Sequence, residues 1–290
     1  MKNKLNIILS PKGGIGKTMI STYLAEFLKD KFKGMNIICM DADNASQSFG
    51  QWDEFNVNPI RTFKNLSTEL NELIEFFNST IETKDTIYIV DTGAAEYATI
   101  TSFMGKINEV YNMIKENNEI VIHTIIGDKQ LLDITTTAID DITNVLQKPR
   151  IALWVNDYFG LSPKFEESIN EIIENYDNIT PIYLYNKNLN ATFIKESIKK
   201  SYSNKIPLNQ YERLDKKIEQ AYMKQFKEFI YDEIEKLFPE TKLPIDNQEE
   251  EINKETESAK ENNESYDETD TMEETNESYD ETDTNEENND

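Results

Sequence analysis

The stretch Ser10–Thr18 combines glycines, a lysine and a hydroxyl residue in a pattern that binds phosphate groups. It follows an apolar run, Leu5–Leu9, and precedes a helical pattern that opens at about Lys17, as a phosphate-binding loop requires. Glycines let backbone N–H groups approach phosphate oxygens, and the start of a helix favours an anion. Lys17 would supply positive charge to the β- and γ-phosphates of a nucleoside triphosphate, and Thr18 a hydroxyl ligand for Mg²⁺. The predicted nucleotide-binding residues of this loop are Gly13, Gly14, Ile15, Gly16, Lys17 and Thr18.

The loop departs from the usual motif at its beginning. Pro11 stands six residues before Lys17, where the usual motif has glycine, and a second lysine, Lys12, precedes Gly13. With this extra lysine the sequence resembles the deviant Walker A ATPases typified by ParA and MinD. In that family the extra lysine reaches across a dimer interface to the phosphates of the partner subunit's nucleotide. The resemblance therefore implies ATP as the nucleotide, an ATP-dependent sandwich homodimer, and catalytic roles for Lys12 and Lys17.

Charge is distributed unevenly over the 290 residues, whose formal net charge is −25. The segment 246–290 contains 20 acidic residues and two lysines, so it holds −18 of that charge. It has almost no branched apolar residues and repeats Asn-Glu-Ser-Tyr-Asp-Glu-Thr-Asp-Thr from Asn263 and again from Asn276. Such a segment cannot bury enough apolar surface to offset its conformational entropy. We predict one domain over residues 1–240 and a disordered acidic tail over 241–290, which either solubilises the protein or docks as a DNA mimic.

Apolar runs alternate with amphipathic stretches along the first 240 residues. The strand-like runs are Leu5–Leu9, Asn36–Met40, Ile87–Val90, Glu119–Ile126, Ile151–Val155 and Ile179–Tyr185. Runs that are apolar throughout are typical of strands buried on both faces, as in a parallel sheet covered by helices. The sequence therefore predicts an α/β fold with a doubly wound, mostly parallel sheet in a three-layer α/β/α domain. The resemblance to ParA and MinD implies that this domain is of the P-loop NTPase (SIMIBI) type. Its ligands should bind at the carboxyl ends of the strands.

Aspartates follow two of these runs at the point where each strand should end. Asp91 follows one run, and a carboxylate beside a phosphate loop can hold Mg²⁺ through its water shell. Asp41 and Asp43 follow another run. By resemblance to ParA and MinD, Asp41 supports the Mg²⁺ site and Asp43 orients or activates the attacking water. Gly93 stands where a switch loop would approach the γ-phosphate closely.

A narrower resemblance comes from strings later in the chain. Val90–Ala95, Val121–Thr124, Leu131–Asp133, Leu153–Asn156 and Tyr158–Gly160 together resemble the TraL-type nucleotide-binding proteins of plasmid conjugal transfer, with StbB-like plasmid-maintenance ATPases as relatives. The similarity runs from about residue 3 to 205. In the ParA/MinD family an asparagine that follows the strand corresponding to Ile151–Val155 reads adenine, and the resemblance implies that role for Asn156. ParA proteins usually carry proline after the Walker B aspartate, whereas this chain has Thr92-Gly93, which disfavours ordinary ParA partitioning.

Other features are expected to be structural. His123 lies within an apolar strand, so we expect a hydrogen-bonded core imidazole, and Cys39, the only cysteine, should be a small core residue. A final helix over about 208–238 carries an apolar stripe that should pack onto the domain. Its stripe residues are Leu214, Ile218, Ala221, Tyr222, Phe229, Ile230, Ile234 and Leu237. The lysines at 195, 199, 200 and 205 could contact DNA or form a solvated helix face.

Two functions remain open from the sequence. In the first, the protein is a slow, partner-stimulated ATPase whose hydrolysis times assembly and release in plasmid transfer or maintenance, or in ParA-like DNA partitioning. In the second, it is a nucleotide-dependent adaptor with negligible turnover. Both imply a protein partner from a conjugation or plasmid-maintenance complex. The chain begins without a signal peptide pattern and has no apolar run of about 20 residues, so a cytoplasmic location in a bacterium is expected.

Overall fold

The computed structural model describes residues 5–60, 85–105, 120–127, 131–146, 148–156, 162–185 and 191–239. The chain divides into a compact unit over Met1–Thr241 and a second unit over Lys242–Asp290. The second unit, and with it the expected acidic tail, lies outside the described residues. The helical stretch expected around residues 66–77 lies outside them as well.

The centre of the first unit is a seven-stranded sheet in which every neighbouring pair is parallel. Its spatial order is β3-β2-β4-β1-β5-β6-β7, so the first strand lies in the middle and the chain winds outward in both directions. The strands are β1 (Leu5–Ile8), β2 (Asn36–Asp41), β3 (Asn58–Pro59), β4 (Thr86–Asp91), β5 (Ile120–Ile126), β6 (Arg150–Val155) and β7 (Ile179–Tyr183). The predicted doubly wound parallel sheet is confirmed.

The six predicted strands are all present, with ends shifted by a few residues, and β3 is an additional strand. This strand pairs only two residues, Asn58 and Pro59, with the end of β2. A pair this short has no periodicity that the sequence could reveal. Proline lacks a backbone N–H and is tolerated in a sheet mainly at an edge, which is where β3 lies.

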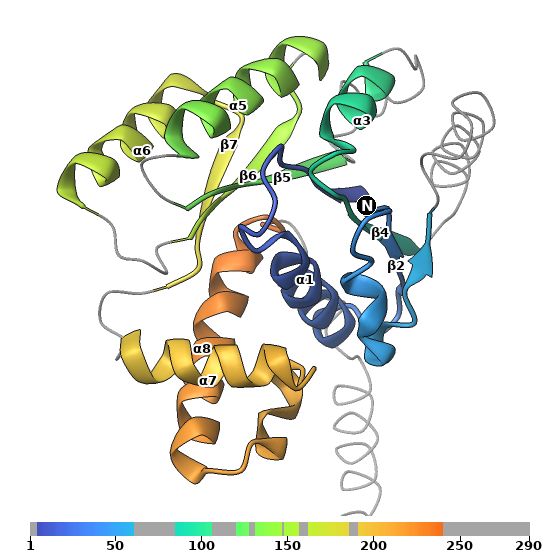
Figure 1. Cartoon of the computed structure of the whole chain (residues 1–290), viewed down its shortest axis with the longest axis vertical. Coiled ribbons are helices and arrows are strands. Elements are labelled where there is room, and N and C mark those ends of the chain that lie inside the picture. The colour runs from blue at the N-terminus through green and yellow to red at the C-terminus, as the bar shows by residue number, and fades with distance from the viewer. Residues whose placement is uncertain are drawn as a thin grey trace, which may run out of the picture. The chain divides into compact units, whose positions relative to one another are not determined.

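Helices cover both faces of the sheet, as Figure 1 shows. On one face lie α1 (Lys17–Lys31), α7 (Ala191–Ser203) and α8 (Lys217–Glu235), with the short 3₁₀ segments η1 (Phe49–Gln51), η2 (Asp53–Phe55) and η4 (Leu208–Arg213). On the other face lie α3 (Tyr97–Met104), α5 (Leu132–Leu146) and α6 (Pro163–Asn175). The arrangement is the predicted three-layer α/β/α domain.

Two hydrophobic cores fill the spaces between the layers, and successive strand residues alternate between them. In β4, Ile87 and Ile89 belong to the core under α1, whereas Tyr88 and Val90 belong to the core under α3 and α5. Side chains of a strand point alternately to its two faces, so a strand covered on both faces must be apolar at every position. This alternation explains why the strands appear in the sequence as continuous apolar runs.

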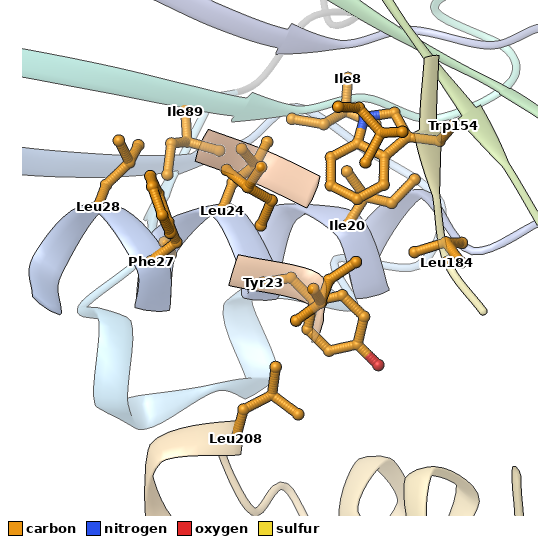
Figure 2. Packing of buried hydrophobic residues seen from close by; sticks show 14 of the residues in the cluster. Ile8, Ile20, Tyr23, Leu24, Phe27, Leu28, Ile89, Trp154, Leu184 and Leu208 are labelled. Atoms are coloured by element: carbon orange, nitrogen blue, oxygen red, sulfur yellow. The ribbon is translucent and has the colours of Figure 1, made fainter. Parts of the chain in front are cut away.

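Helix α1 is enclosed between the sheet and the C-terminal helices. Figure 2 shows Ile20, Leu24 and Leu28 turned toward the sheet, while Tyr23 is turned toward Leu208 of η4. The helix is therefore buried nearly all round and has no single apolar stripe. Because α1 begins at the phosphate-binding loop, this enclosure fixes the end of the helix that the site uses.

The predicted final helix over 208–238 is two segments in the structure. Segment η4 ends at Arg213, Lys216 has extended backbone, and α8 begins at Lys217. The buried face of α8 is also displaced from the predicted stripe, because Met223 and Phe226 are buried whereas Ile218 is 55% exposed. Ile230 and Ile234 of the predicted stripe lie on the buried face of α8, whereas Ile218 lies outside it. The helix nevertheless packs onto the domain through the core that contains α1.

Three polar side chains form a buried hydrogen-bonded row across the neighbouring strands β1, β5 and β6. Trp154 in β6 donates its indole N–H to Nδ1 of His123 in β5 at 2.9 Å. Nε2 of His123 must then carry the imidazole hydrogen, and it lies 3.1 Å from Oδ1 of Asn6 in β1. Burial lowers the pKa of His123 to about 3, and the charge of Arg150 acts in the same direction. His123 is the hydrogen-bonded core imidazole that the sequence predicts.

Within the described ranges, no helix combines the length and apolarity needed to cross a membrane.

Candidate functional site

The neighbouring strands β2, β4 and β1 bring the candidate site residues to one edge of the sheet. The register pairs Ile8 at the end of β1 with Asp91 in β4, and Asp91 with Asp41 in β2. Parallel strands end on the same side, so the loops that follow β1, β2 and β4 meet there. The candidate site therefore lies at the carboxyl edge, where the topology of a doubly wound sheet places ligands.

The loop that follows β1 depends on glycine at two positions. Gly14 has φ +73° and Gly16 has φ +106°, a region that other residues enter only with strain. Gly16 immediately precedes α1, and its carbonyl accepts the N–H of Ile20 in the first turn. The loop thus delivers its backbone N–H groups to the start of a helix, whose dipole favours an anion.

Lys17 closes this loop with its own side chain. Its Nζ donates to the carbonyl oxygen of Lys12 at 2.9 Å, and the residue is buried. Burial lowers the pKa of Lys17, while the charges of Asp91, Asp43 and Glu96 oppose that effect. A buried ammonium that faces three carboxylates can balance the charge of a polyphosphate placed between them.

Thr18 and Asp91 form the contact expected of a magnesium site. The Thr18 hydroxyl donates to Oδ2 of Asp91 at 2.7 Å and lies 2.6 Å from Oγ of Ser48. Oδ1 of Asp91 is buried and has no hydrogen-bond partner among the described residues. Burial raises the pKa of Asp91 to about 7, although the hydrogen bond from Thr18 opposes the rise. A cation would remove both the unpaired oxygen and this desolvation cost, so the residues present fit Mg²⁺.

Asp41 holds the loop that follows β2. Its Oδ1 accepts the backbone N–H of Asp43 at 2.9 Å. Its Oδ2 accepts the N–H groups of Phe49 and Gly50 at 3.0 and 2.9 Å. Burial raises the pKa of Asp41, and these backbone hydrogen bonds act against the rise. With both oxygens hydrogen-bonded to the loop, Asp41 shapes the backbone that carries Asp43 and Ser48.

Asp43 closes a tight turn within the same loop. Oδ1 accepts the N–H groups of Ala45 and Ser46 at 2.9 and 3.0 Å, and Oδ2 accepts the Ser46 hydroxyl at 2.7 Å. Burial acts to raise the pKa of Asp43, but the hydrogen bonds from Ser46 and Ala45 hold it below its ordinary value. The carboxylate is therefore ionised, ordered and a weak base.

These loops enclose a cleft of about 600 Å³, a size that accommodates a nucleotide-sized ligand. The described residues that line it are Gly13, Gly14, Gly16, Lys17, Thr18, Met19, Asp43, Ala45, Ser46, Ser48, Ala94, Ala95, Glu96 and Tyr202. The predicted residues Gly13, Gly14, Gly16, Lys17, Thr18 and Asp43 are among them, with Asp91 and Asp41 directly behind.

Besides Asp41 and Asp91, three of the predicted residues lie outside this lining. Lys12 is exposed on the loop, where it can face a second molecule. The side-chain amide of Asn156, which follows β6, donates to the carbonyl of Ile15 at 3.2 Å. Asn156 therefore contacts the phosphate-binding loop at the backbone of Ile15, which is itself outside the cleft lining. The role of Asn156 in reading adenine stays a prediction.

Sequence reasoning missed three side chains that the fold brings to the cleft. Ser48 reaches Thr18 from the loop after β2, and Glu96 enters from the loop after β4. Tyr202 comes from α7, far along the chain, and its ring packs against Trp52 with centroids 5.5 Å apart. Burial raises the pKa of the Tyr202 phenol, and a hydrogen bond with Thr18 lowers it. Only Glu96 had a sequence signal, its position five residues after the predicted magnesium aspartate.

Two kinds of known protein resemble this chain, one in sequence and one in fold. No family model matches the chain. One TraL protein of Escherichia coli is 27% identical over 163 residues, which are 54% of this chain and 64% of the relative. A second TraL protein of Escherichia coli is 24% identical over 162 residues, with the same coverage. The chain thus spans less than two thirds of the length of these curated relatives.

Among solved structures, the MinD cell division protein of Aquifex aeolicus aligns with 83% of this chain and 98% of its own, at a TM-score of 0.50 and 13% identity. At that identity the likeness concerns the fold alone. The sequence resemblance to the ParA/MinD ATPases and to TraL is confirmed by the two kinds of comparison together.

Proposed function

We propose that this protein is a Mg²⁺-dependent ATP-binding and ATP-hydrolysing switch that acts in plasmid conjugal transfer or maintenance. The observation that carries the proposal is the group formed by Lys17, Thr18 and Asp91 at the start of α1. It combines a buried ammonium, a hydroxyl bonded to a carboxylate, and a buried carboxylate oxygen without a partner among the described residues. The MinD-like fold and the similarity to TraL support the proposal.

In the proposed site the loop N–H groups and Lys17 bind the phosphates. Thr18 and Asp91 hold Mg²⁺, and Asp41 supports the site through the backbone that it orders. The cation, when bound, neutralises charge on the β- and γ-phosphates. Asp43 orients the attacking water, because its carboxylate is fixed at the cleft by three hydrogen bonds. Water orientation of this kind lowers the entropic part of the barrier.

The switch is proposed to operate through an ATP-dependent sandwich homodimer. Lys12 is exposed beside the cleft, which is where a residue that reaches a partner's phosphates must lie. The closed dimer would engage a protein of the transfer or maintenance complex, and hydrolysis would release it. Similarity to TraL favours transfer over maintenance.

The proposal is tested by titrating Mg·ATP and Mg·GTP into the purified full chain with isothermal titration calorimetry. We expect micromolar affinity for Mg·ATP, weaker binding of Mg·GTP, and loss of both in Lys17→Ala. Lys224→Ala, which removes an exposed lysine of α8, is the matched control and should bind as the unchanged protein does. Retained affinity in a folded Lys17→Ala protein would contradict the proposed site.

An adaptor with negligible turnover is the second candidate, and one observation favours it. Asp43, the predicted water-activating residue, has both oxygens engaged within its own turn and a lowered pKa. Steady-state phosphate release, measured with and without DNA or a protein of the transfer complex, separates the candidates. Release that none of these additions stimulates would favour the adaptor.

ParA-like DNA partitioning gains little from the lysine cluster. Lys200 forms ion pairs with Asp215 and Glu219 at 2.8 and 2.9 Å. Lys205 lies over the rings of Trp52 and Tyr202 at 5.2 and 4.8 Å. These two lysines already have partners within the chain, so a DNA contact through them would compete with existing interactions.

A further inference from the structure

Two carboxylate oxygens at the candidate site are buried without a hydrogen-bond partner among the described residues. One is Oδ1 of Asp91, which the magnesium site accounts for. The other is Oε2 of Glu96, and no part of the proposed site uses it. An unpaired buried carboxylate oxygen is costly, so its presence in a ligand cleft needs an explanation.

Glu96 lies between β4 and α3 and lines the same cleft as Lys17 and Asp43. It occupies the N-cap position of α3, but its side chain makes no capping hydrogen bond with that helix. The residue is 2% exposed. A helix-capping role therefore does not account for the carboxylate, which is turned toward the loops of the site.

The surroundings of Gly93 show how close Glu96 and Asp43 are. A side chain at Gly93 would collide with Oε2 of Glu96, and its Cβ would lie 3.0 Å from Cγ of Asp43. Backbone N–H groups of Glu96 and Asn44 hydrogen-bond the Glu96 carboxylate. Two carboxylates thus converge over one glycine, and a side chain at this position would displace them.

The two carboxylates differ in what they can still bind. Asp43 already accepts three hydrogen bonds from Ala45 and Ser46, so only its Oδ2, which accepts one of them, can accept another from a water. Glu96 keeps one oxygen available. Burial raises the pKa of Glu96, and the charge of Asp43 adds to the rise, whereas the N–H groups and Lys17 oppose it. A raised pKa makes a carboxylate a better proton acceptor near neutral pH.

We propose that Glu96 is the residue that accepts a proton from the attacking water, while Asp43 only positions that water. An ordered water needs two to four polar partners, and Oε2 of Glu96, the Asp43 carboxylate and a phosphate oxygen would supply them. This inference rests on the proposed ATPase function, and it assigns to Glu96 the activation of water that the family resemblance implied for Asp43.

The proposed hydrolysis replaces one oxygen bond of the γ-phosphorus by another. The water oxygen forms a bond to the γ-phosphorus while the bond from that phosphorus to the bridging oxygen of ADP breaks. The electron pair of the broken bond stays on ADP, and one water proton passes to Oε2 of Glu96. The products are ADP and inorganic phosphate, and the proton later leaves Glu96 for solvent.

The test compares Glu96→Gln with Asp43→Asn in the full-length protein, using single-turnover hydrolysis of γ-labelled ATP with protein in excess. Both substitutions keep side-chain shape and remove the charge. We expect Glu96→Gln to slow hydrolysis by about 100-fold or more, the usual effect of removing a general base. The rate of Asp43→Asn should fall less, and it should keep the decline with falling pH that Glu96→Gln loses.

A second readout does not depend on hydrolysis. Removing a negative charge beside the phosphates should leave Mg·ATP affinity unchanged or tighten it by up to about tenfold. Glu26→Gln, which replaces a buried carboxyl group of α1 outside the cleft lining by an amide, is the matched control for the substitution itself and should hydrolyse ATP normally. Thermal unfolding of each variant confirms that it folds.

The possible results distinguish failure of the role of Glu96 from failure of the proposed ATPase function. Hydrolysis in Glu96→Gln within about threefold of the unchanged protein overturns the role of Glu96 while the ATPase proposal stands. An unchanged protein that binds no Mg·ATP overturns the proposed function itself. Binding without any hydrolysis favours the adaptor and overturns the Glu96 proposal.

Discussion

At the scale of single residues, the carboxylates of the site differ in the hydrogen-bond partners of their oxygens. Asp41 and Asp43 are occupied by donors from one loop and therefore order that loop. Asp91 and Glu96 each keep a buried oxygen without a partner among the described residues. Residues of one chemical class can thus do different work, because hydrogen bonds commit some of them to the backbone and leave others available to a ligand.

Replacing Asp43 by alanine should separate binding from turnover. The turn loses an acceptor for three donors, so the attacking water is no longer oriented, but Lys17, Thr18 and Asp91 remain in place. We expect Mg·ATP affinity within about threefold of the unchanged protein and single-turnover hydrolysis slower by at least about tenfold. The variant should then accumulate with ATP bound. Hydrolysis at the normal rate would leave Asp43 with a structural role only.

At the scale of elements, α1 links the cleft to the C-terminal helices. Its buried Glu26 accepts the backbone N–H of Asn209, just after η4 begins, at 2.9 Å. Burial raises the pKa of Glu26 to about 8, although hydrogen bonds from Leu208 and Asn209 oppose the rise. The contact orders the segment before α8, but the ionised form of the carboxylate is costly in this position.

The stability of this contact should depend on pH in a defined direction. Between the ordinary carboxylate pKa and about 8, the folded state holds a proton on Glu26 that the unfolded state has released. The free energy of unfolding therefore falls as the pH rises through that window. Glu26→Gln removes the titration, so we expect its melting temperature to exceed that of the unchanged protein by about 2–4 °C near pH 8.5, corresponding to roughly 1 kcal/mol.

The comparison near pH 5 provides the control for this experiment. There Glu26 is protonated in the folded state, so the amide replaces a neutral group and the difference in melting temperature should shrink. Differential scanning calorimetry at both pH values measures it. A gain that is equal at both pH values would show that packing, not ionisation, causes the effect.

At the scale of the whole molecule, most of the net charge lies in the last 45 residues of the sequence. Residues 246–290 hold −18 of the net charge of −25 and lie beyond the described part of the chain. An acidic segment with few apolar residues contributes little buried surface. Deleting 246–290 should therefore leave Mg·ATP affinity and the melting temperature nearly unchanged. A fall of more than about 5 °C, measured calorimetrically, would show that the tail docks on the domain.

The proposed dimer is the other property of the whole molecule. Two ATP molecules that face each other across an interface concentrate negative charge, and Lys12 is the exposed cation placed to offset it. A hydrogen bond from lysine to phosphate contributes about 1.5–3 kcal/mol, and a twofold dimer uses it twice. Lys12→Ala should bind ATP but dimerise more weakly by roughly 3–6 kcal/mol, or two to four decades in affinity.

Sedimentation velocity with a non-hydrolysable ATP analogue measures this difference between the unchanged protein and Lys12→Ala. Lys224→Ala again serves as the control for removal of a surface lysine. An unchanged protein that stays monomeric at tens of micromolar, or a Lys12→Ala variant that dimerises equally well, would exclude the sandwich dimer.

The sequence by itself determined the features that are local in the chain. The phosphate-binding loop is a contiguous stretch whose glycines need positive φ, so Gly14 and Gly16 could be identified from their neighbours. Strands covered on both faces must be apolar throughout, so the parallel sheet and the aspartates at its edge were predictable. The break before α8 and the two-residue β3 were not, because neither changes the local pattern.

Only the tertiary structure decided which of these residues can still act on a ligand. The donors that engage Asp43 come from its own turn. Glu96, in contrast, accepts the N–H of Asn44 from another loop and keeps Oε2 without a partner among the described residues, which no pattern in the sequence records. Tyr202 reaches the cleft because α7 packs on α8, and α8 in turn packs on α1. Asn156 turns toward the loop carbonyl of Ile15 for the same kind of reason. Composition and spacing select the chemistry that is present, but side-chain partners across the fold determine where it is used.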